Sequence, residues 1–151
     1  MEQASLSSPL GDLTLTQEGD AITALSWGGG AGLPRTDLLK KAADQLVAYF
    51  NGQLTQFDIA LRPHASAFQQ EFLAALQDIP FGETLTYGDL SKTLGRPAQA
   101  IGQACGANPI PILIPCHRVL GGTTLGGFSA PGGVETKVWL LKHEGAAGLL
   151  I

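Results

Sequence analysis

Residues 108–120 read NPIPILIPCHRVL, a strongly apolar stretch that three prolines interrupt. Proline has no backbone N–H to give to a sheet, so this stretch cannot be a regular central strand. Asn108 precedes a proline and therefore ends any helix before it, and its side chain can bond to the neighbouring backbone and fix a turn. We expect a stiff, buried segment that presents Cys116 and His117 side by side, because rigid backbone beside a thiol preorganises a site.

A single cysteine is most often buried and inert, but an imidazole next to Cys116 can remove the thiol proton directly or through one water. A carboxylate that orients the imidazole would complete a relay. Residues 134–146 are predicted to form a helix with Val138, Leu141 and Trp139 inward and Gly145 at its C-terminal cap. Glu144 is the candidate, because it lies at the end of this helix, where an acid opposes the helix dipole and needs a partner. We interpret His143 as the cation that a helix end favours and Cys105 as a packed, small apolar residue.

The composition is that of a folded protein. A chain of 151 residues with 44% hydrophobic and 15% charged residues can bury a substantial core. No apolar run approaches the roughly 20 residues of a membrane helix, and residues 1–11 do not resemble a secretory signal. Two cysteines favour a cytoplasmic protein with reduced thiols. The three histidines and two cysteines show no metal-ligand spacing, so we expect no metal and no cofactor.

The formal net charge of −4 argues weakly against a nucleic-acid partner, because neutralising phosphates requires Lys and Arg. The acidic residues are unevenly placed, however. Residues 1–65 carry seven acidic and four basic side chains, whereas residues 66–151 carry six and five. A local basic face in the second part remains open.

The first part of the chain is expected to begin with small β ribbons. A strand over residues 4–11 ends in a Pro-Leu-Gly turn. Alternating residues on either side of Glu18-Gly19-Asp20 then predict a hairpin over residues 12–28.

A helix follows the ribbons. Pro34 is predicted to lie in its first turn and Gly52 to end it. Residues 55–63 are predicted to form a short strand, and Arg62-Pro63-His64 is the expected boundary between two lobes. The inward face of the helix is expected to consist of Leu38, Leu39, Ala42, Leu46 and Phe50.

The second part is predicted to be mainly helical. Ser66 can cap a helix over residues 67–79, and Thr86 can cap a shorter helix over residues 87–94 with Leu90 and Leu94 inward. The apolar stripe of the first of these helices consists of Phe68, Phe72, Leu73, Leu76 and Ile79.

Gly95 then forms a turn, and Pro97 starts a helix over residues 98–107. Two short helices joined by a glycine-containing turn are typical of a helix-turn-helix. The second helix consists mostly of alanine and glycine, so it can pack tightly on a core, or its backbone can approach another surface such as a nucleic-acid groove. The exposed polar residues in and just before it, Arg96, Gln99 and Gln103, are few for reading base edges in the usual way.

The stretch NPIPILIPCHRVL, together with TYGDLS at 86–91 and LLKHEG at 140–145, resembles the O6-alkylguanine-DNA alkyltransferases, also called methylated-DNA–protein-cysteine methyltransferases. The Pro-Cys-His-Arg-Val core, with Asn-Pro eight residues before the cysteine, is highly specific for this family. The resemblance implies an α/β (α+β) fold. An RNase-H-like N-terminal lobe with β ribbons would cover residues 1–65, and a helical, winged helix-turn-helix-like lobe for DNA binding and alkyl acceptance would cover residues 66–151.

The resemblance further implies a DNA-repair protein that flips O6-alkylguanine out of duplex DNA and transfers the alkyl group irreversibly to its own cysteine, once per molecule. Cys116 would be the acceptor, His117 its base through a water, and Glu144 the group that orients His117. Tyr87 would aid the departure of the guanine, and Asn108 would tie the DNA-reading helix to the cysteine loop.

Substrate and DNA contacts are implied in the same way. Ser129, in a loop that closes over the flipped base, and Val119 would contact the substrate, whereas Arg118 would be structural. The thin helix would lie in the minor groove, where little sequence can be read. Its contacts would come from Arg96, Ala98, Gln99, Ala100 and Gln103. The resemblance implies no membrane and no protein partner, so we expect a monomer.

Gln99 departs from the family pattern, in which an arginine nine residues before the motif's asparagine enters the base stack. Glutamine is shorter and uncharged, so it fills space but loses attraction to phosphate. Arg96, about one helical turn away, can compensate. The departure therefore concerns DNA affinity and not the transfer chemistry.

Two other classes of function remain open. A cysteine-dependent hydrolase would use Cys116 and His117 with repeated turnover. A non-catalytic helix-turn-helix DNA-binding module would need no thiol, and Cys116→Ser would leave its activity intact.

Overall fold

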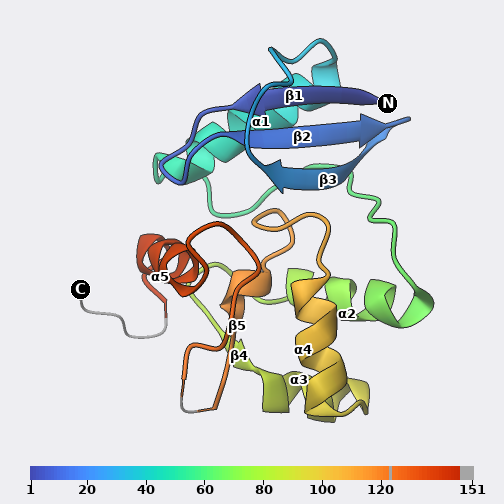
Figure 1. Cartoon of the computed structure of the whole chain (residues 1–151), viewed down its shortest axis with the longest axis vertical. Helices are drawn as coiled ribbons and strands as arrows, with labels where there is room; N and C mark the ends of the chain where they lie inside the picture. The colour runs from blue at the N-terminus through green and yellow to red at the C-terminus, as the bar shows by residue number, and fades with distance from the viewer. Residues whose placement is uncertain (123, 147–151) are drawn as a thin grey trace. The chain divides into compact units, whose positions relative to one another are not determined.

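The structure is a computed structural model that describes residues 1–122 and 124–146 (Figure 1). The chain divides into two compact units, the first covering Met1–His64 and the second beginning at Ala65.

The first unit is a three-stranded antiparallel sheet with one helix. β1 (Glu2–Leu6), β2 (Leu13–Glu18) and β3 (Ala21–Trp27) are neighbours in chain order. The turn between β2 and β3 lies at Gly19-Asp20, which confirms the predicted hairpin, and Gly19 supplies the positive φ of 62° that such a turn requires. α1 (Asp37–Phe50) packs on the sheet (Figure 1).

α1 begins later than the sequence predicts. The Thr36 hydroxyl accepts a hydrogen bond from the Leu39 amide at 3.1 Å, which satisfies one of the unpaired N–H groups of the first turn. Pro34 therefore lies before the helix and not in it. Leu38 is only half-buried. The rest of the predicted inward face is buried, namely Leu39, Ala42, Leu46 and Phe50.

The strand predicted over residues 55–63 is wrong in extent. Only Leu61 forms a bridge, with Ile22 of β3. The Ile22 amide donates to Ala60 O and the Arg62 amide donates to Ile22 O, both at 2.9 Å. The segment therefore touches the edge of the sheet at one point without continuing it.

The second unit is mainly helical, as predicted. Ser66 caps α2 (Ala67–Gln77), its hydroxyl accepting from the Gln69 amide at 3.2 Å. Phe68, which the sequence predicts in the buried stripe of this helix, is only half-buried. The other members of the stripe, Phe72, Leu73, Leu76 and Ile79, are buried.

The predicted pair of short helices is confirmed. Thr86 caps α3 (Tyr87–Leu94) through a capping box, in which its hydroxyl accepts from the Asp89 amide at 3.0 Å and its own amide donates to the Asp89 carboxylate at 2.9 Å. Gly95 ends α3 in the left-handed conformation at φ 65°. α4 (Ala98–Gly106) begins directly after Pro97.

A short parallel ladder connects segments that are distant in sequence. β4 (Leu85–Thr86) pairs with β5 (Val119–Leu120), and Leu85 is opposite Val119. Because β4 leads directly into Tyr87 and β5 directly follows a 3₁₀ turn, η1 (Cys116–Arg118), the ladder holds the start of α3 near the cysteine motif.

α5 (Val134–His143) contacts η1, and its buried face differs from the prediction. Leu141 is buried as expected, but Val138 and Trp139 are half-buried. Leu140 and Lys137 are fully buried instead. The helix ends at His143 with Glu144 as its C-cap, one residue before Gly145, which the sequence predicts as the cap.

None of the helices in residues 1–122 and 124–146 combines the length and the apolar character needed to cross a membrane.

Candidate active site

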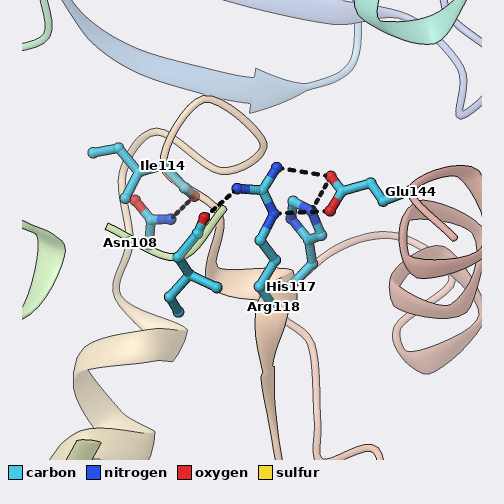
Figure 2. Close-up of polar contacts among 6 residues, drawn as sticks. Asn108, Ile114, His117, Arg118 and Glu144 are labelled. Carbon is cyan, nitrogen blue, oxygen red and sulfur yellow. Dashed lines mark hydrogen bonds and ion pairs between the residues drawn. The ribbon is translucent and has the colours of Figure 1, made fainter. Parts of the chain in front are cut away.

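Asn108 organises the approach to the cysteine. Its side-chain oxygen accepts from the Ile110 amide at 3.0 Å, and its side-chain nitrogen donates to Ile114 O at 2.9 Å (Figure 2). The first bond is the local turn that the sequence predicts; the second spans six residues and closes the segment on itself. One side chain therefore fixes both ends of a loop that begins where α4 has just ended.

Two tight turns follow inside this loop. The Leu113 amide donates to Pro111 O at 2.8 Å, which encloses Ile112 at a positive φ of 71°. The Cys116 amide donates to Ile114 O at 2.9 Å across Pro115. Both are three-residue γ-turns, and a β-branched residue at positive φ costs about 1–3 kcal/mol.

The strain at Ile112 is offset by burial, because the apolar residues of the loop, Ile110, Ile112, Leu113 and Ile114, are all buried. The segment is irregular, as its prolines predict, and the Cys116 backbone has little freedom.

Glu144 is the centre of a buried polar cluster (Figure 2). Its carboxylate lies 2.7 Å from His117 Nε2, and it accepts two hydrogen bonds from Arg118, from Nε at 2.8 Å and from Nη2 at 3.1 Å. Arg118 Nη1 also donates to Ile79 O at 2.6 Å. The structure thus brings together the His117 and Glu144 pair that the sequence proposes, and it adds Arg118 as a second partner of Glu144.

The burial of His117 favours its neutral form. The side chain is 0% exposed, and this burial lowers its pKa, although the neighbouring Glu144 acts in the opposite direction. Nε2 faces Glu144, so Nδ1 is the other available atom of the ring. Nδ1 is buried and has no hydrogen-bond partner within the described residues.

Cys116 is 4% exposed, and its thiol pKa is lowered even though burial alone would raise it. The largest cause is a hydrogen bond with the Cys105 thiol, and the Asn108 side chain and the Lys137 ammonium act in the same direction. Hydrogen bonds and positive charge favour the thiolate, which is the nucleophilic form.

Lys137 is a buried cation that sequence reasoning did not select. Its Nζ donates to Val119 O at 2.6 Å and to Gly127 O at 3.2 Å, and burial lowers its pKa. The signal was present in the sequence: Lys137 lies three and four residues before Leu140 and Leu141, so all three share one helix face.

A pocket of about 250 Å³ has Cys105 in its lining. Its lining consists of Tyr87, Gly102, Cys105, Gly106, Gly127, Phe128 and Ser129. Tyr87 and Ser129 are the two residues of this lining that the sequence selects. Cys105, interpreted from the sequence as packed filler, is half-buried and contributes its side chain to the pocket, so that interpretation is wrong.

Tyr87 presents a protonated phenol. Burial raises its pKa to about 12, and the nearby thiols act in the same direction. Gly126 approaches its ring so closely that a Cβ there would lie 2.9 Å from Tyr87 Cε2 and 3.1 Å from the hydroxyl oxygen. The loop that carries Ser129 therefore fits against Tyr87 only because it has glycine at this point.

The remaining predicted contacts are placed as follows. Val119 is fully buried, and its carbonyl accepts from Lys137. Ala98, Gln99 and Gln103 are exposed on α4, and Ala100 is half-buried. Arg96 is exposed, but its guanidinium lies 4.8 Å from the centre of the Phe68 ring, and its carbonyl accepts from the Ser91 hydroxyl. Arg96 therefore contacts α2 through its guanidinium and α3 through its carbonyl, while its side chain stays accessible to solvent.

Within the described residues, no group of three or more His, Cys, Asp or Glu side chains is arranged to hold a metal ion.

Comparison with known proteins agrees with this geometry. Residues 67–146 match the family model described as 6-O-methylguanine DNA methyltransferase, DNA binding domain, and residues 1–63 match its ribonuclease-like domain. The chain is 36% identical to the methylated-DNA–protein-cysteine methyltransferase of Methanosarcina acetivorans, over 97% of this chain and 99% of that protein. It is 40% identical to the protein of the same name from Mycobacterium bovis, over 93% and 90%.

A crystal structure of Mycobacterium tuberculosis OGT in complex with DNA has a similar fold. It covers 96% of this chain and 93% of its own, with a TM-score of 0.85 and 39% identity. The predicted fold class, an α/β (α+β) protein with a ribonuclease-like N-terminal lobe and a DNA-binding C-terminal lobe, is confirmed.

Proposed function

The chain belongs to the methylated-DNA–protein-cysteine methyltransferase family, and we propose that it repairs O6-alkylguanine in duplex DNA by moving the alkyl group to Cys116. The observation that carries this proposal is the thiol itself. Cys116 has a lowered pKa, stands on a rigid loop next to the His117 and Glu144 pair, and contacts Cys105, which lines the pocket. A thiolate in such a place is prepared for one displacement reaction.

The reaction begins with loss of the Cys116 proton. His117 Nδ1 is buried without a protein partner in the described chain, while Nε2 is bound to Glu144. A water between Nδ1 and the thiol would satisfy this nitrogen and carry the proton to it, with Glu144 stabilising the imidazolium. Burial that keeps His117 neutral at rest leaves it able to accept the proton.

In the transfer step the Cys116 sulfur attacks the alkyl carbon. The sulfur–carbon bond forms as the carbon–O6 bond breaks, and the electron pair moves to the guanine oxygen. Tyr87, protonated with a pKa of about 12, supplies a hydrogen-bond donor for that oxygen, and Ser129 lies in the same pocket as a second donor. The thioether product is stable, so each molecule acts once.

DNA recognition is proposed for the unit that contains residues 66–151, with residues 1–65 as a separate ribonuclease-like lobe. The exposed face of α4 offers Ala98, Gln99 and Gln103, small or uncharged side chains suited to the minor groove, with Arg96 and Ala100 beside them. The target guanine must leave the base stack to reach the pocket, at a cost of a few kcal/mol that is lower for a weakened pair.

Reduced thiols also support a cytoplasmic location. Cys105 and Cys116 are both free thiols, and an acceptor that must remain a thiol requires a reducing compartment. Action as a monomer is part of the proposal, because no step of the proposed reaction requires a second chain.

The test is mass spectrometry after incubation with a duplex that contains O6-methylguanine. One equivalent of duplex should add one methylene to the protein, on the peptide that contains Cys116, and further equivalents should add nothing. Repeated turnover would indicate the hydrolase alternative, and a Cys116→Ser chain that retained full activity would indicate a binding module.

A further inference from the structure

Cys105 is a thiol in the pocket that the transfer reaction does not use. It is the next-to-last residue of α4, and its sulfur lies 3.6 Å from the carbonyl oxygen of Cys116. Gly102 and Gly106 flank it on the same helix face, so Cys105 is the one α4 residue in the pocket lining with a side chain beyond a hydrogen atom. Its thiol therefore lies between the pocket and the loop that carries Cys116.

The two thiols are unlike in their acid–base behaviour. The pKa of Cys105 is raised by its hydrogen bond to Cys116 and by burial, whereas the pKa of Cys116 is lowered by the same hydrogen bond. The contact between them therefore favours the protonated form of Cys105 and the thiolate form of Cys116. Pairs in which a protonated thiol donates to a thiolate have this pattern.

The thiol proton of Cys105 can be donated to either of two acceptors, the Cys116 carbonyl oxygen or the Cys116 sulfur. The Cys105 thiol donates to the Cys116 carbonyl oxygen at 3.6 Å. A thiol proton rotates about the Cβ–Sγ bond, and the opposite pKa directions of the two thiols are those expected when this proton is donated to the Cys116 sulfur. Once Cys116 is ionised, the charged acceptor is the stronger one, because hydrogen bonds to an ion are roughly twice as strong as neutral ones.

Other groups around the pair add to the effect of this donor, and Cys105 remains the largest cause of the lowered Cys116 pKa. The titratable and charged groups near the pair are Tyr87 from α3, Lys137 from α5, and His117 with Glu144 and Arg118 behind it. The Asn108 amide gives one of its two hydrogens to Ile114 O, and the Lys137 ammonium gives two of its three to carbonyl oxygens, so each keeps one N–H that can favour the Cys116 thiolate.

We propose that Cys105 is a positioning residue for the acceptor: it donates its S–H to the Cys116 thiolate and holds that sulfur facing the pocket. This inference rests on the proposed function. During transfer Cys105 keeps its proton and forms no bond to carbon. When Cys116 becomes a thioether, the charge that attracted the proton is gone, and the S–H returns to the carbonyl oxygen.

The test compares Cys105→Ala, which removes the donor, with Cys105→Ser, which keeps a donor of similar size. Cys116 carboxamidomethylation by iodoacetamide is followed against pH by mass spectrometry of the Cys116 peptide, so that any reaction at Cys105 is counted separately. Cys105→Ala should move the midpoint of the profile up by about one pH unit and slow the reaction about tenfold near neutral pH. Cys105→Ser should stay near the parental midpoint.

Two results would overturn the proposal: a Cys105→Ala profile identical to that of the parent, or a Cys105→Ser profile displaced as far as that of Cys105→Ala. If the alanine chain does not fold, Cys105→Val takes its place, because valine fills the space without a donor. Single-turnover transfer from an O6-methylguanine duplex is measured in parallel. If the parent itself accepts no methyl group, the proposed function is wrong, while the iodoacetamide profiles still decide the role of Cys105.

Discussion

Replacing Glu144 by Gln should destabilise the fold as well as slow transfer. The carboxylate is fully buried and accepts from both His117 and Arg118. Glutamine keeps the shape but removes the charge, so the buried Arg118 guanidinium keeps only Ile79 O and one amide oxygen as acceptors. Removing one partner of a buried ion pair costs about 3–5 kcal/mol, against a total stability of about 5–15 kcal/mol.

The loss should be visible in both chemical and thermal unfolding. For a chain of this size, each kcal/mol lowers the melting temperature by about 2–4 °C, so Glu144→Gln should melt roughly 6–20 °C below the parent. Glu135→Gln is the matched control, because Glu135 is an exposed carboxylate in the first turn of α5, and it should stay within about 0.5 kcal/mol of the parent. If Glu144→Gln unfolds like Glu135→Gln in urea, the buried pair does not carry the stability assigned to it.

The chemical effect is then separated from the folding effect. Transfer is measured under single-turnover conditions well below the melting point, where each variant is folded, and Glu144→Gln should be about 10²–10⁴-fold slower because His117 loses its orienting charge. Arg118→Met is the second control. It removes the guanidinium but leaves Glu144 beside His117, so it should lose stability with a much smaller loss of rate. Equal rates for Glu144→Gln and the parent would refute the relay.

Three further substitutions test separate parts of the site. Lys137→Met removes a buried ammonium that lowers the Cys116 pKa. In this variant the Cys116 pKa should rise, and the pH–rate profile of transfer should move to higher pH. An unchanged midpoint of the profile would contradict this role of Lys137. Gly126→Ala should displace the Tyr87 phenol and slow transfer by up to about 10²-fold, with the affinity for duplex DNA unchanged. Transfer at the parental rate would show that the phenol does not need its present position. Gln99→Arg should tighten duplex binding in low salt and steepen the log–log salt dependence of the affinity by about 0.9. Its reaction with a free O6-alkylguanine base should stay the same. A loss of thermal stability with no gain in affinity would show that Gln99 does not face DNA.

The local elements follow from the sequence because their signals are local. The β2–β3 turn, the caps at Ser66 and Thr86, and the end of α3 at Gly95 each depend on one side chain and its near neighbours. The irregular shape of residues 108–115 follows from its prolines in the same way.

The errors have equally specific causes. Pro34 and Thr36 are both acceptable helix starts, and only the hydroxyl's bond to the Leu39 amide decides between them. On α5, the apolar residues suggest that Val138 faces inward, but Lys137 is buried because Val119 and Gly127 supply carbonyl oxygens for its ammonium. Those partners are 18 and 10 residues away, and no local pattern reveals them.

The candidate site likewise combines contacts that the sequence predicts with contacts that only the fold reveals. Sequence reasoning could connect His117 with Glu144 because each needs a partner, yet it could not see that Arg118 shares that carboxylate. It also misjudged Cys105, since a lone thiol in a helix of small residues looks like filler. Only the fold places its sulfur 3.6 Å from the Cys116 carbonyl.

The small residues of α4 now have a reason that neither sequence interpretation contained. The helix has three distinct faces: Ile101 and Ala104 are buried in the core, and Gln99 and Gln103 are exposed.

The third face, Gly102, Cys105 and Gly106, lines the pocket. A Cβ at Gly102 would meet no protein atom within 4 Å, and one at Gly106 would lie 3.4 Å from Ser129 Oγ, so added side chains there would project into the pocket that we propose for the substrate. Glycine keeps that face open, and the same thinness lets the exposed face come close to DNA. The small residues of α4 therefore keep the pocket open, and Cys105 is the single α4 residue of its lining that is not glycine.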